Sequence, residues 1–384
     1  MHLMVILEDR ISEWEAKGEI LDGYFNPAGV FDTVTVLGLV EDQPEDLMIA
    51  RLCAPARHRY VNVGIDRRGL MTATFGLRPG RLETRLARLI SDLLSDPPDL
   101  VRAYGDGLAA VAAAVVGREA QIPYAVSLHT TPDPHIQSQY VGARDRLWRR
   151  LLAPSVHQAL RGAGAVMAVY APIRDYLPPD IAERTVVVPN VVGVTARPTV
   201  SERYGVPMRA LWLGRQMPGR DPGPIIAALK VTPNVELTLI GDGPLHDTAQ
   251  RAAEEGGVGR RTSFIRAMDN RELCASLPRY DVLVVNSAFR EMPKTVMEAA
   301  LSGLPIIVNR LPAVESPEYA SLHVLFVDGN SGAYASALRD LEGNPRKRVA
   351  FAQETQDAAW RMWDPDRVAT QTADILRALA ERAD

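Results

Sequence analysis

The sequence predicts an α/β protein made of two doubly wound, Rossmann-like domains, each built on a parallel sheet. Short runs rich in Val, Ile and Leu alternate with helical patterns, which is typical of parallel sheets covered by helices on both faces. The chain has 384 residues, and this length favours two hydrophobic cores over one. Residues 189–205 contain strand breakers and show no clear periodicity, so we expect the linker between the domains there.

Twelve candidate strands follow one another along the chain, six in each half. They are residues 2–8, 32–39, 98–104, 124–129, 165–170 and 184–189 in the first half, and 210–214, 235–243, 262–267, 281–287, 304–309 and 323–328 in the second.

The helices expected between these strands include residues 105–120 and 222–231. We assign residues 1–192, together with a C-terminal helix at about 365–384, to one domain, and residues 205–362 to the other. Ligands of doubly wound folds bind at the carboxyl ends of the strands. Two such domains are therefore expected to face each other across a ligand-binding cleft.

Composition limits the kinds of partner. A net charge of -4 argues against bulk nucleic-acid binding. The two cysteines, Cys53 and Cys274, are far apart in the sequence, so they form neither a metal-ligand cluster nor a disulfide framework. Glu8 and Asp9 come before any signal-peptide core could form, and no apolar run approaches the ~20 residues that span a bilayer. We therefore expect a cytoplasmic protein.

Two arginines follow the first strand of the second half. That strand ends at Gly214, and Arg215 and Arg220 lie in a Gly/Pro loop before a helix that begins near Pro222. Two guanidinium groups above a helix start suit a phosphate group, because arginine offers planar pairs of donors and the helix end adds partial positive charge. The alternative is a pair of solvated loop arginines.

The stretch "REMPKTVMEAALSGLP", residues 290–305, predicts a second anion site. Pro293 fits the first helical position and Gly303 fits the helix stop. Backbone N–H groups at Met292, Lys294 and Thr295 would then be available to an anion.

Two glutamates flank this helix start. Glu298 lies inside a helix that is apolar nearly all round, so we expect it to be buried and to have partners. There it could accept two adjacent ribose hydroxyls, and Glu291, ahead of the helix, could accept hydroxyls of a sugar. The alternative is a pair of solvated glutamates that stabilise the helix dipole.

Two weaker signals lie in the first half. Arg102 and Tyr104 stand at a strand end and could touch a second substrate, although such residues are as often structural. A basic run around a tryptophan could bind an anionic membrane surface weakly, or it could be a solvated helix face with one packed tryptophan. Its residues are Arg144, Arg146, Trp148, Arg149 and Arg150.

The ordered segments "LGRQMPGRDP", "LIGDGPL", "YDVLVVNS" and "EMPKTVMEAALSGLPIIVN" resemble the nucleotide-sugar half of retaining glycosyltransferases of the GT-B fold, family four. The resemblance covers about residues 209–328. Residues 98–130 look like that family's strand, helix and His-bearing strand end. The resemblance therefore implies a GT-B architecture with a nucleotide-sugar donor.

The family pattern implies roles for particular residues. Arg215 and Arg220 would clamp the diphosphate, Glu298 would hold the ribose, and His129 would face the transferred sugar. Gly18, beside Lys17, would lie near the donor phosphates or the acceptor. The residues implied in catalysis are His129, Arg215, Arg220 and Glu291. The residues implied in donor binding are Gly18, Gly214, Arg215, Arg220, Glu291, Met292, Pro293, Lys294, Thr295 and Glu298.

The chain departs from the family at two positions. Six residues separate Glu291 from Glu298 where the family usually has seven, so either Glu291 reaches the sugar through a shorter turn or Arg290 takes its place. We favour Glu291. Arg266 stands where the family commonly has a small residue, which would alter the nucleobase pocket or the loop beside it.

The expected activity is metal-independent, retaining transfer of a hexose-type sugar from a nucleoside diphosphate sugar, without a cofactor, to an acceptor held mainly by the first domain. One alternative is a degenerate GT-B protein that binds a nucleotide or a partner without transfer. Another is a nucleotide-sugar epimerase. The base, the sugar, the acceptor and the oligomeric state stay open.

Overall fold

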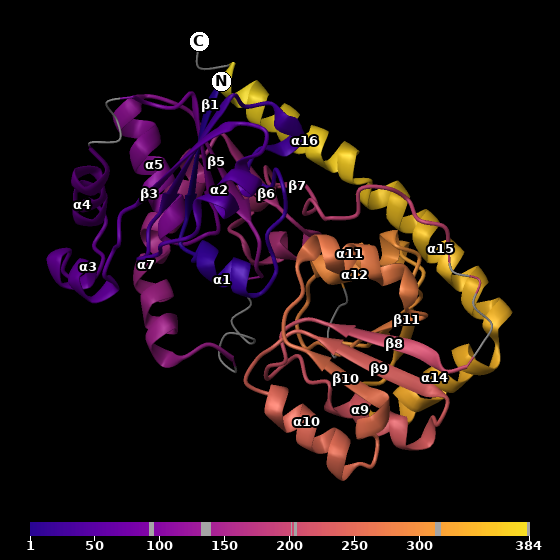
Figure 1. The fold of residues 1–384 in the computed structure, drawn as a ribbon. Coiled ribbons are helices and arrows are strands. Elements are labelled where there is room, and N and C mark those ends of the chain that lie inside the picture. The colour runs from indigo at the N-terminus through magenta and orange to yellow at the C-terminus, as the bar shows by residue number, and fades with distance from the viewer. Residues whose placement is uncertain (92–95, 132–139, 201, 203–205, 312–315, 382–384) are drawn as a thin grey trace. The chain divides into compact units, whose positions relative to one another are not determined.

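The structure is a computed structural model in which residues 1–91, 96–131, 140–200, 202, 206–311 and 316–381 are described (Figure 1). The chain divides into two compact units. The first contains Met1–Ala16, Ile20–Val191 and Asp366–Asp384, and the second contains Lys17–Glu19 and Val192–Pro365. Each unit holds one sheet, of seven and six strands respectively, and all of the named strand pairs are parallel. The predicted fold class is confirmed.

The first sheet has the strand order β3-β2-β1-β4-β5-β6-β7. Its strands are β1 (His2–Leu7), β2 (Thr33–Gly38), β3 (Arg57–Asn62), β4 (Leu100–Tyr104), β5 (Tyr124–Leu128), β6 (Ala165–Ala168) and β7 (Val186–Val187).

The edge strand β3 was not predicted. Its sequence, "RHRYVN", lacks the run of apolar residues that marks the other strands, and every one of its side chains is exposed or half-buried. An edge strand is held mainly by its ladder to one neighbour, here β2, so it needs no apolar pattern of its own.

The helices of the first unit cover this sheet. They are α1 (Ile11–Ala16), α2 (Asp46–Cys53), α3 (Arg67–Ala73), α4 (Arg81–Ile90), α5 (Leu108–Ala120), α7 (Ala143–Gly162), α8 (Pro179–Ala182) and α16 (Pro365–Ala380). The last of these, at the far end of the chain, returns to the first strands (Figure 1). Its Leu376 and Leu379 belong to the same buried cluster as Leu3 and Val34.

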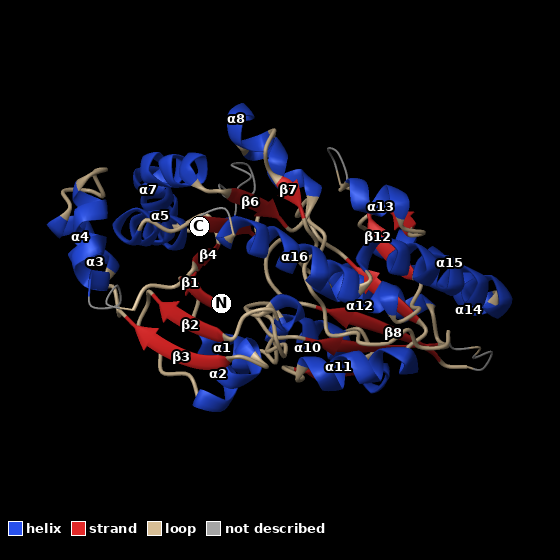
Figure 2. Cartoon of the chain, turned by 90° about the horizontal axis from the view of Figure 1, so that it is seen from above, coloured by secondary structure: helices blue, strands red, loops and turns tan. Residues whose placement is uncertain are grey.

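The second sheet has the order β10-β9-β8-β11-β12-β13. Its strands are β8 (Met208–Leu213), β9 (Val235–Ile240), β10 (Thr262–Ile265), β11 (Val282–Val285), β12 (Ile306–Asn309) and β13 (Leu325–Val327). Its helices are α9 (Gly223–Ala228), α10 (His246–Glu255), α11 (Asn270–Ser276), α12 (Lys294–Leu301), α13 (Pro317–Ser321), α14 (Ser331–Gly343) and α15 (Pro345–Trp363). Helices lie on both sides of the strands (Figure 2). Five of these six strands fall within a predicted segment, and β8 begins two residues before the predicted 210–214.

Strand order positions the sites. In the second sheet β8 lies between β9 and β11, so the direction of winding reverses beside β8. In the first sheet β1 lies between β2 and β4, so the reversal falls there. The crevice beyond the carboxyl ends of the strands at such a reversal is where doubly wound proteins bind ligands. Ligand sites are therefore expected at the loops after β8 and β11 in the second sheet, and after β1 and β4 in the first.

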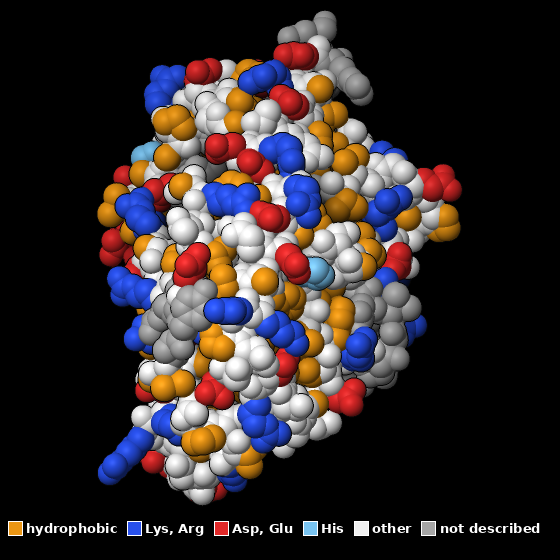
Figure 3. Space-filling view, turned by 90° about the vertical axis from the view of Figure 1, so that its right-hand side faces the viewer, with side chains coloured by type: hydrophobic (Ala, Val, Ile, Leu, Met, Phe, Trp, Pro, Cys, Tyr) orange, Lys and Arg blue, Asp and Glu red, His pale blue; other side chains and the backbone are white. Residues whose placement is uncertain are grey.

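One face of the molecular surface is mixed in charge (Figure 3). On the face drawn in Figure 3, Lys and Arg side chains are interspersed with Asp and Glu, in keeping with the net charge of -4. None of the helices in the described ranges is both long enough and apolar enough to cross a membrane.

Candidate active site

The loops after β8 and β9 are joined backbone to backbone. Gln216 donates its N–H to the carbonyl of Asp242 (2.9 Å) and its side-chain amide to the carbonyl of Gly241 (2.9 Å). A Cβ on Gly241 would lie 2.1 Å from the carbonyl oxygen of Gly214. Gly214 itself has a φ of 138°, which favours glycine. The Gly-Asp-Gly turn therefore has a structural function, because it lets the two strand-end loops touch.

The structure joins two predicted site residues, Arg220 and Glu291. Arg220 Nη2 donates to both carboxylate oxygens of Glu291, at 2.5 and 2.7 Å, and Nε donates to Oε1 at 3.1 Å. The guanidinium also lies over the ring of Phe289, 4.8 Å from its centroid. Arg215 precedes this pair on the same loop, and its side chain is exposed. A bidentate pair of this kind has a defined geometry that a single point charge lacks.

The loop that carries Glu291 is held from two sides. The backbone N–H of Ser287 donates to Asn309 Oδ1 at 2.8 Å. The side-chain amide of Asn309 in turn donates to the carbonyl of Ser287 at 2.9 Å. The N–H of Ala288 donates to the carbonyl of Gly219 at 2.7 Å. Because Gly219 directly precedes Arg220, this bond ties the arginine loop to the glutamate loop.

The start of α12 corrects one prediction. Pro293 was expected at the first helical position, but its ψ of 143° is extended and it is the N-cap, so Lys294 is the first helical residue. Lys294 and Thr295 provide first-turn N–H groups, for which an α-helix has no internal acceptor. Met292 is buried. Helix α12 ends as predicted, with Gly303 at a φ of 78° just after the C-cap.

Glu298 is buried and has partners, as predicted from its apolar flanks. Its Oε1 accepts from the side-chain amide of Asn270 at 2.9 Å and from the backbone N–H of Gly193 at 3.5 Å. Burial raises the pKa of Glu298, and the amide of Asn270 and the charge of Lys294 partly oppose that rise. The result is a carboxylate fixed in position within the second unit.

The partners of Glu298 were missed by sequence reasoning. Asn270 is the first residue of α11, and it looks like an ordinary polar residue at a helix start. Cys274, one turn further on, lies beside the same group, and burial together with the nearby Glu298 raises the pKa of its thiol. Neither spacing nor residue type signals this cluster, because it joins segments far apart in the sequence.

Arg266 points to acidic side chains near its own strand. It donates to Asp242 at 2.7 Å and to Asp247 at 3.2 Å, and all three side chains are exposed. The pKa of Asp242 is lowered, first by the N–H of Gly243 and then by Arg266. The arginine is thus engaged at the surface of the second unit.

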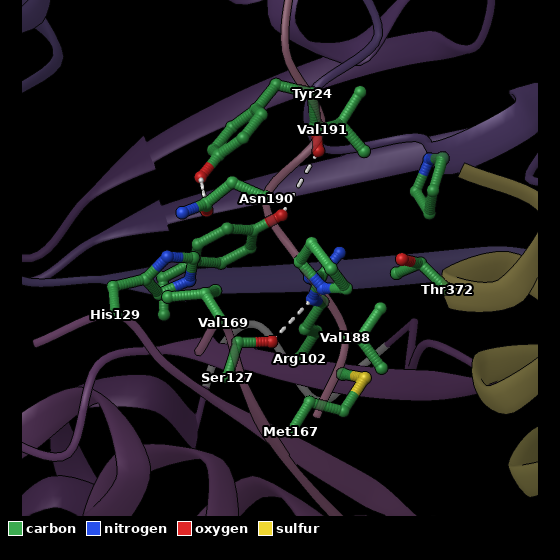
Figure 4. Close-up of a pocket in the computed structure, with 13 residues that line it drawn as sticks. Tyr24, Arg102, Ser127, His129, Met167, Val169, Val188, Asn190, Val191 and Thr372 are labelled. Carbon is green, nitrogen blue, oxygen red and sulfur yellow. Dashed lines mark hydrogen bonds between the residues drawn. The ribbon is translucent and has the colours of Figure 1, made fainter. Parts of the chain in front are cut away.

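The remaining predicted residues lie elsewhere. His129 follows β5 in the first unit, and its ring stacks on Tyr104 with centroids 5.1 Å apart and planes 12° apart. Both line a pocket of about 370 Å³ that also includes Arg102 (Figure 4). Gly18 has a φ of 74°. Together with Lys17 it belongs to the second unit, although the residues on either side of Lys17–Glu19 belong to the first.

The basic run around Trp148, for which weak membrane binding was one interpretation, lies on α7. Trp148 is only 6% exposed, and the guanidinium of Arg67 lies 5.0 Å from its ring centroid. The tryptophan is therefore packed within the first unit and is not available as a membrane anchor. The four arginines of the run are exposed, namely Arg144, Arg146, Arg149 and Arg150.

Comparisons with known proteins follow the same division of the chain. Residues 224–344 match the family model described as glycosyl transferases group 1, and residues 32–191 match the model of a glycosyl transferase 4-like domain. Glycogen synthase of Mycobacterium tuberculosis (strain CDC 1551 / Oshkosh) is 26% identical over 309 residues, which are 78% of this chain and 73% of that protein. The 2-deoxystreptamine N-acetyl-D-glucosaminyltransferase of Streptomyces fradiae is 30% identical over 231 residues, 54% of each chain.

Solved structures show the same fold. HepE of Anabaena in complex with UDP has a TM-score of 0.71 at 17% identity, covering 99% of this chain and 100% of that one. The glycosyltransferase WaaG has a TM-score of 0.65 at 15% identity, with 97% and 99% coverage. The two parallel-sheet units are thus those of the GT-B fold. The chain belongs to the GT4-like glycosyltransferases of this fold.

Proposed function

We propose that this enzyme transfers a hexose-type sugar from a nucleoside diphosphate sugar to an acceptor, with retention of configuration and without a metal ion. The observation that supports this best is the bidentate pair of Arg220 and Glu291, next to Arg215, at the winding reversal of the second sheet. A cation for the diphosphate and a carboxylate for the sugar hydroxyls lie together there. HepE, a neighbour in fold, has been solved with UDP and with UDP-glucose.

The proposed chemistry is mainly electrostatic. As the glycosidic C–O bond breaks, negative charge grows on the leaving diphosphate, and Arg215, Arg220 and the first-turn N–H groups of α12 stabilise that charge. In this proposal the arginines supply the positive charge that a metal ion would otherwise bring. The acceptor attacks from the face that the diphosphate leaves, and a phosphate oxygen takes the proton of the acceptor hydroxyl. No protein nucleophile is required.

Donor binding would change the partner of Arg220. In the structure its guanidinium is held by Glu291, so a diphosphate must replace the carboxylate or share the guanidinium with it. We propose replacement, because it frees Glu291 to accept hydroxyls of the sugar. Glu298, held by Asn270, would accept the two ribose hydroxyls.

The other predicted roles stay proposals. His129 would face the transferred sugar, Gly18 would lie near the donor phosphates or the acceptor, and the first unit would hold the acceptor. We also propose that the reaction takes place in the cytoplasm. Membership of a transferase family favours transfer over the alternatives of binding without turnover and of epimerisation.

A thermal-shift panel tests the donor site. UDP, GDP, ADP and dTDP are added, with and without magnesium, to the wild type and to Arg215→Ala, and the unfolding midpoint Tm is measured. One nucleotide should raise Tm of the wild type equally with and without magnesium, and the shift should be lost in the variant. No shift with any nucleotide, in folded protein, would contradict the proposal, and a shift only with magnesium would contradict metal independence.

A further inference from the structure

The pocket beside His129 lies within the first unit and is formed by segments from both ends of that unit. Tyr24 comes from the loop after α1, Arg102 and Tyr104 from the end of β4, Ser127 from β5 and Thr372 from α16. Figure 4 shows the side chain of Arg102 between Ser127 and Val188, in the middle of the residues that line the pocket.

Arg102 is 7% exposed, a degree of burial that a guanidinium rarely reaches without a counter-ion. Its Nε donates to Ser127 Oγ at 2.9 Å, and its guanidinium carbon lies 4.5 Å from the ring centroid of Tyr104. In the described ranges no carboxylate forms an ion pair with it, and no Asp or Glu lines the pocket. Among the described residues, the side chain of Arg102 makes its one hydrogen bond through Nε, and the residue lines the pocket.

Another arginine in this chain shows what a structural guanidinium looks like. Arg261 donates from its two terminal nitrogens to the backbone carbonyls of Thr232, Val235 and Leu229, at 2.9, 2.8 and 2.6 Å. Those bonds satisfy the group within the protein. Arg102 has instead a single hydrogen bond within the described part of the chain, from Nε to the hydroxyl of Ser127. The donors on its terminal nitrogens therefore remain for a ligand.

We propose that this pocket binds an anionic group, a phosphate or a carboxylate, of a small polyhydroxylated acceptor. An unpaired buried charge is costly, and a bound anion would remove that cost while accepting two parallel N–H bonds from Arg102. Ser127 and Tyr104 fix the plane of the guanidinium, so its donors are oriented before the ligand arrives. That the bound molecule is the acceptor rests on the proposed function, whereas the anion site itself does not.

Matched ligands test this inference on the whole chain. Glucose, glucose 6-phosphate and glucuronate are compared by calorimetry at constant ionic strength, in the presence of a saturating nucleoside diphosphate that occupies the donor site. The wild type should bind at least one of the two anionic sugars at least tenfold more tightly than glucose, as expected for hydrogen bonds to a charged group. Preference for the phosphate or for the carboxylate distinguishes the two chemistries.

Variants locate the binding. Arg102→Gln should abolish the preference for the anionic sugar, whereas Arg118→Gln should retain it. Arg118→Gln removes the same charge from an exposed position on α5, outside the pocket, and so serves as the matched control. If Arg102→Gln does not fold, Asn190→Asp replaces it as the test, because it leaves the arginine in place and adds a negative charge to the pocket wall. This variant should weaken binding of the anionic sugar by a similar factor.

Each result has a defined meaning. Equal binding of glucose and both anionic sugars by the wild type, no binding of any of them, or a preference that survives in Arg102→Gln would overturn the inference. If the wild type binds no nucleotide but shows the Arg102-dependent preference, the anion site stands and the proposed transferase function fails. If the nucleotide binds and the preference is absent, the anion site fails and the proposed transferase function stands.

Discussion

Substitution of Glu291 by glutamine tests whether Arg220 must change partner when the donor binds. Glutamine keeps the size of the side chain and removes the charge that holds the guanidinium at 2.5 and 2.7 Å. If a diphosphate has to displace Glu291, the wild type loses the free energy of that pair on every binding event. The Glu291→Gln variant does not, so it should bind the nucleoside diphosphate more tightly.

The magnitude follows from the exposure of the two side chains. Arg220 is 31% exposed and Glu291 is 16% exposed, so solvent screens part of the attraction. Opposite charges near a protein surface attract by about 4 kcal/mol at 4 Å, but desolvation and lost side-chain freedom leave a net value of about 1 kcal/mol for such a pair. One kcal/mol corresponds to about a fivefold change in Kd.

Turnover should change in the opposite direction. In the proposed mechanism Glu291 accepts hydroxyls of the sugar, and a hydrogen bond to a charged group contributes about 1.5 to 3 kcal/mol. The kcat of Glu291→Gln should therefore fall by about tenfold or more while the Kd of the nucleotide falls. A residue that merely maintained the fold would weaken binding and turnover together.

Calorimetry with the nucleotide that stabilises the wild type gives Kd, and initial rates of sugar transfer give kcat. Glu236→Gln is the matched control, because it removes one carboxylate from an exposed position on β9 of the same unit. An unchanged or larger Kd in Glu291→Gln, with the control unaffected, would refute replacement and would mean that the pair stays closed with donor bound.

Three further predictions concern the second unit. Arg215→Ala should lower kcat by roughly 10² to 10³, the scale for one lost transition-state donor, and a near-normal rate would remove its proposed role. Burial raises the pKa of Glu298, so its contribution to stability is present at low pH and is lost as the pH rises through that pKa. Glu298→Gln should thus have a higher Tm than the wild type at pH 8, and the difference should shrink toward pH 4.5; a difference independent of pH would contradict this. Gly241→Ala should lower Tm by several degrees in a melting curve, because its Cβ would lie 2.1 Å from the carbonyl oxygen of Gly214. An unchanged Tm would show that the two loops can separate freely.

The sequence revealed features that depend on local pattern. Runs of Val, Ile and Leu located the strands of the second sheet, and the apolar neighbours of Glu298 predicted its burial. A helix stop at Gly303 followed from the tolerance of glycine for positive φ. The N-cap at Pro293 was misplaced by one residue, because proline fits both positions and only ψ distinguishes them.

Contacts between segments far apart in the sequence could not be predicted from local pattern. Arg220 and Glu291 were each assigned a ligand, yet in the structure each is the partner of the other across 71 positions in the sequence. Asn270 has no local feature that identifies it as the residue that holds Glu298. Strand β3 was missed because an edge strand can form from polar residues. Pairings of this kind depend on which loops the sheet brings together, and local composition does not encode that.

The return of α16 to the first unit has a consequence for how the protein is made. Leu376 and Leu379 belong to the buried cluster of Leu3 and Val34, so the core of the first unit is incomplete until residues 376–379 have left the ribosome. At about 5–20 residues per second, synthesis of residues 192–365 alone takes roughly 10 to 30 s. During that time the apolar surface that α16 will cover is available to chaperones. The second unit has most of its own sheet and helices within one continuous stretch, so it can complete its core before the first unit does.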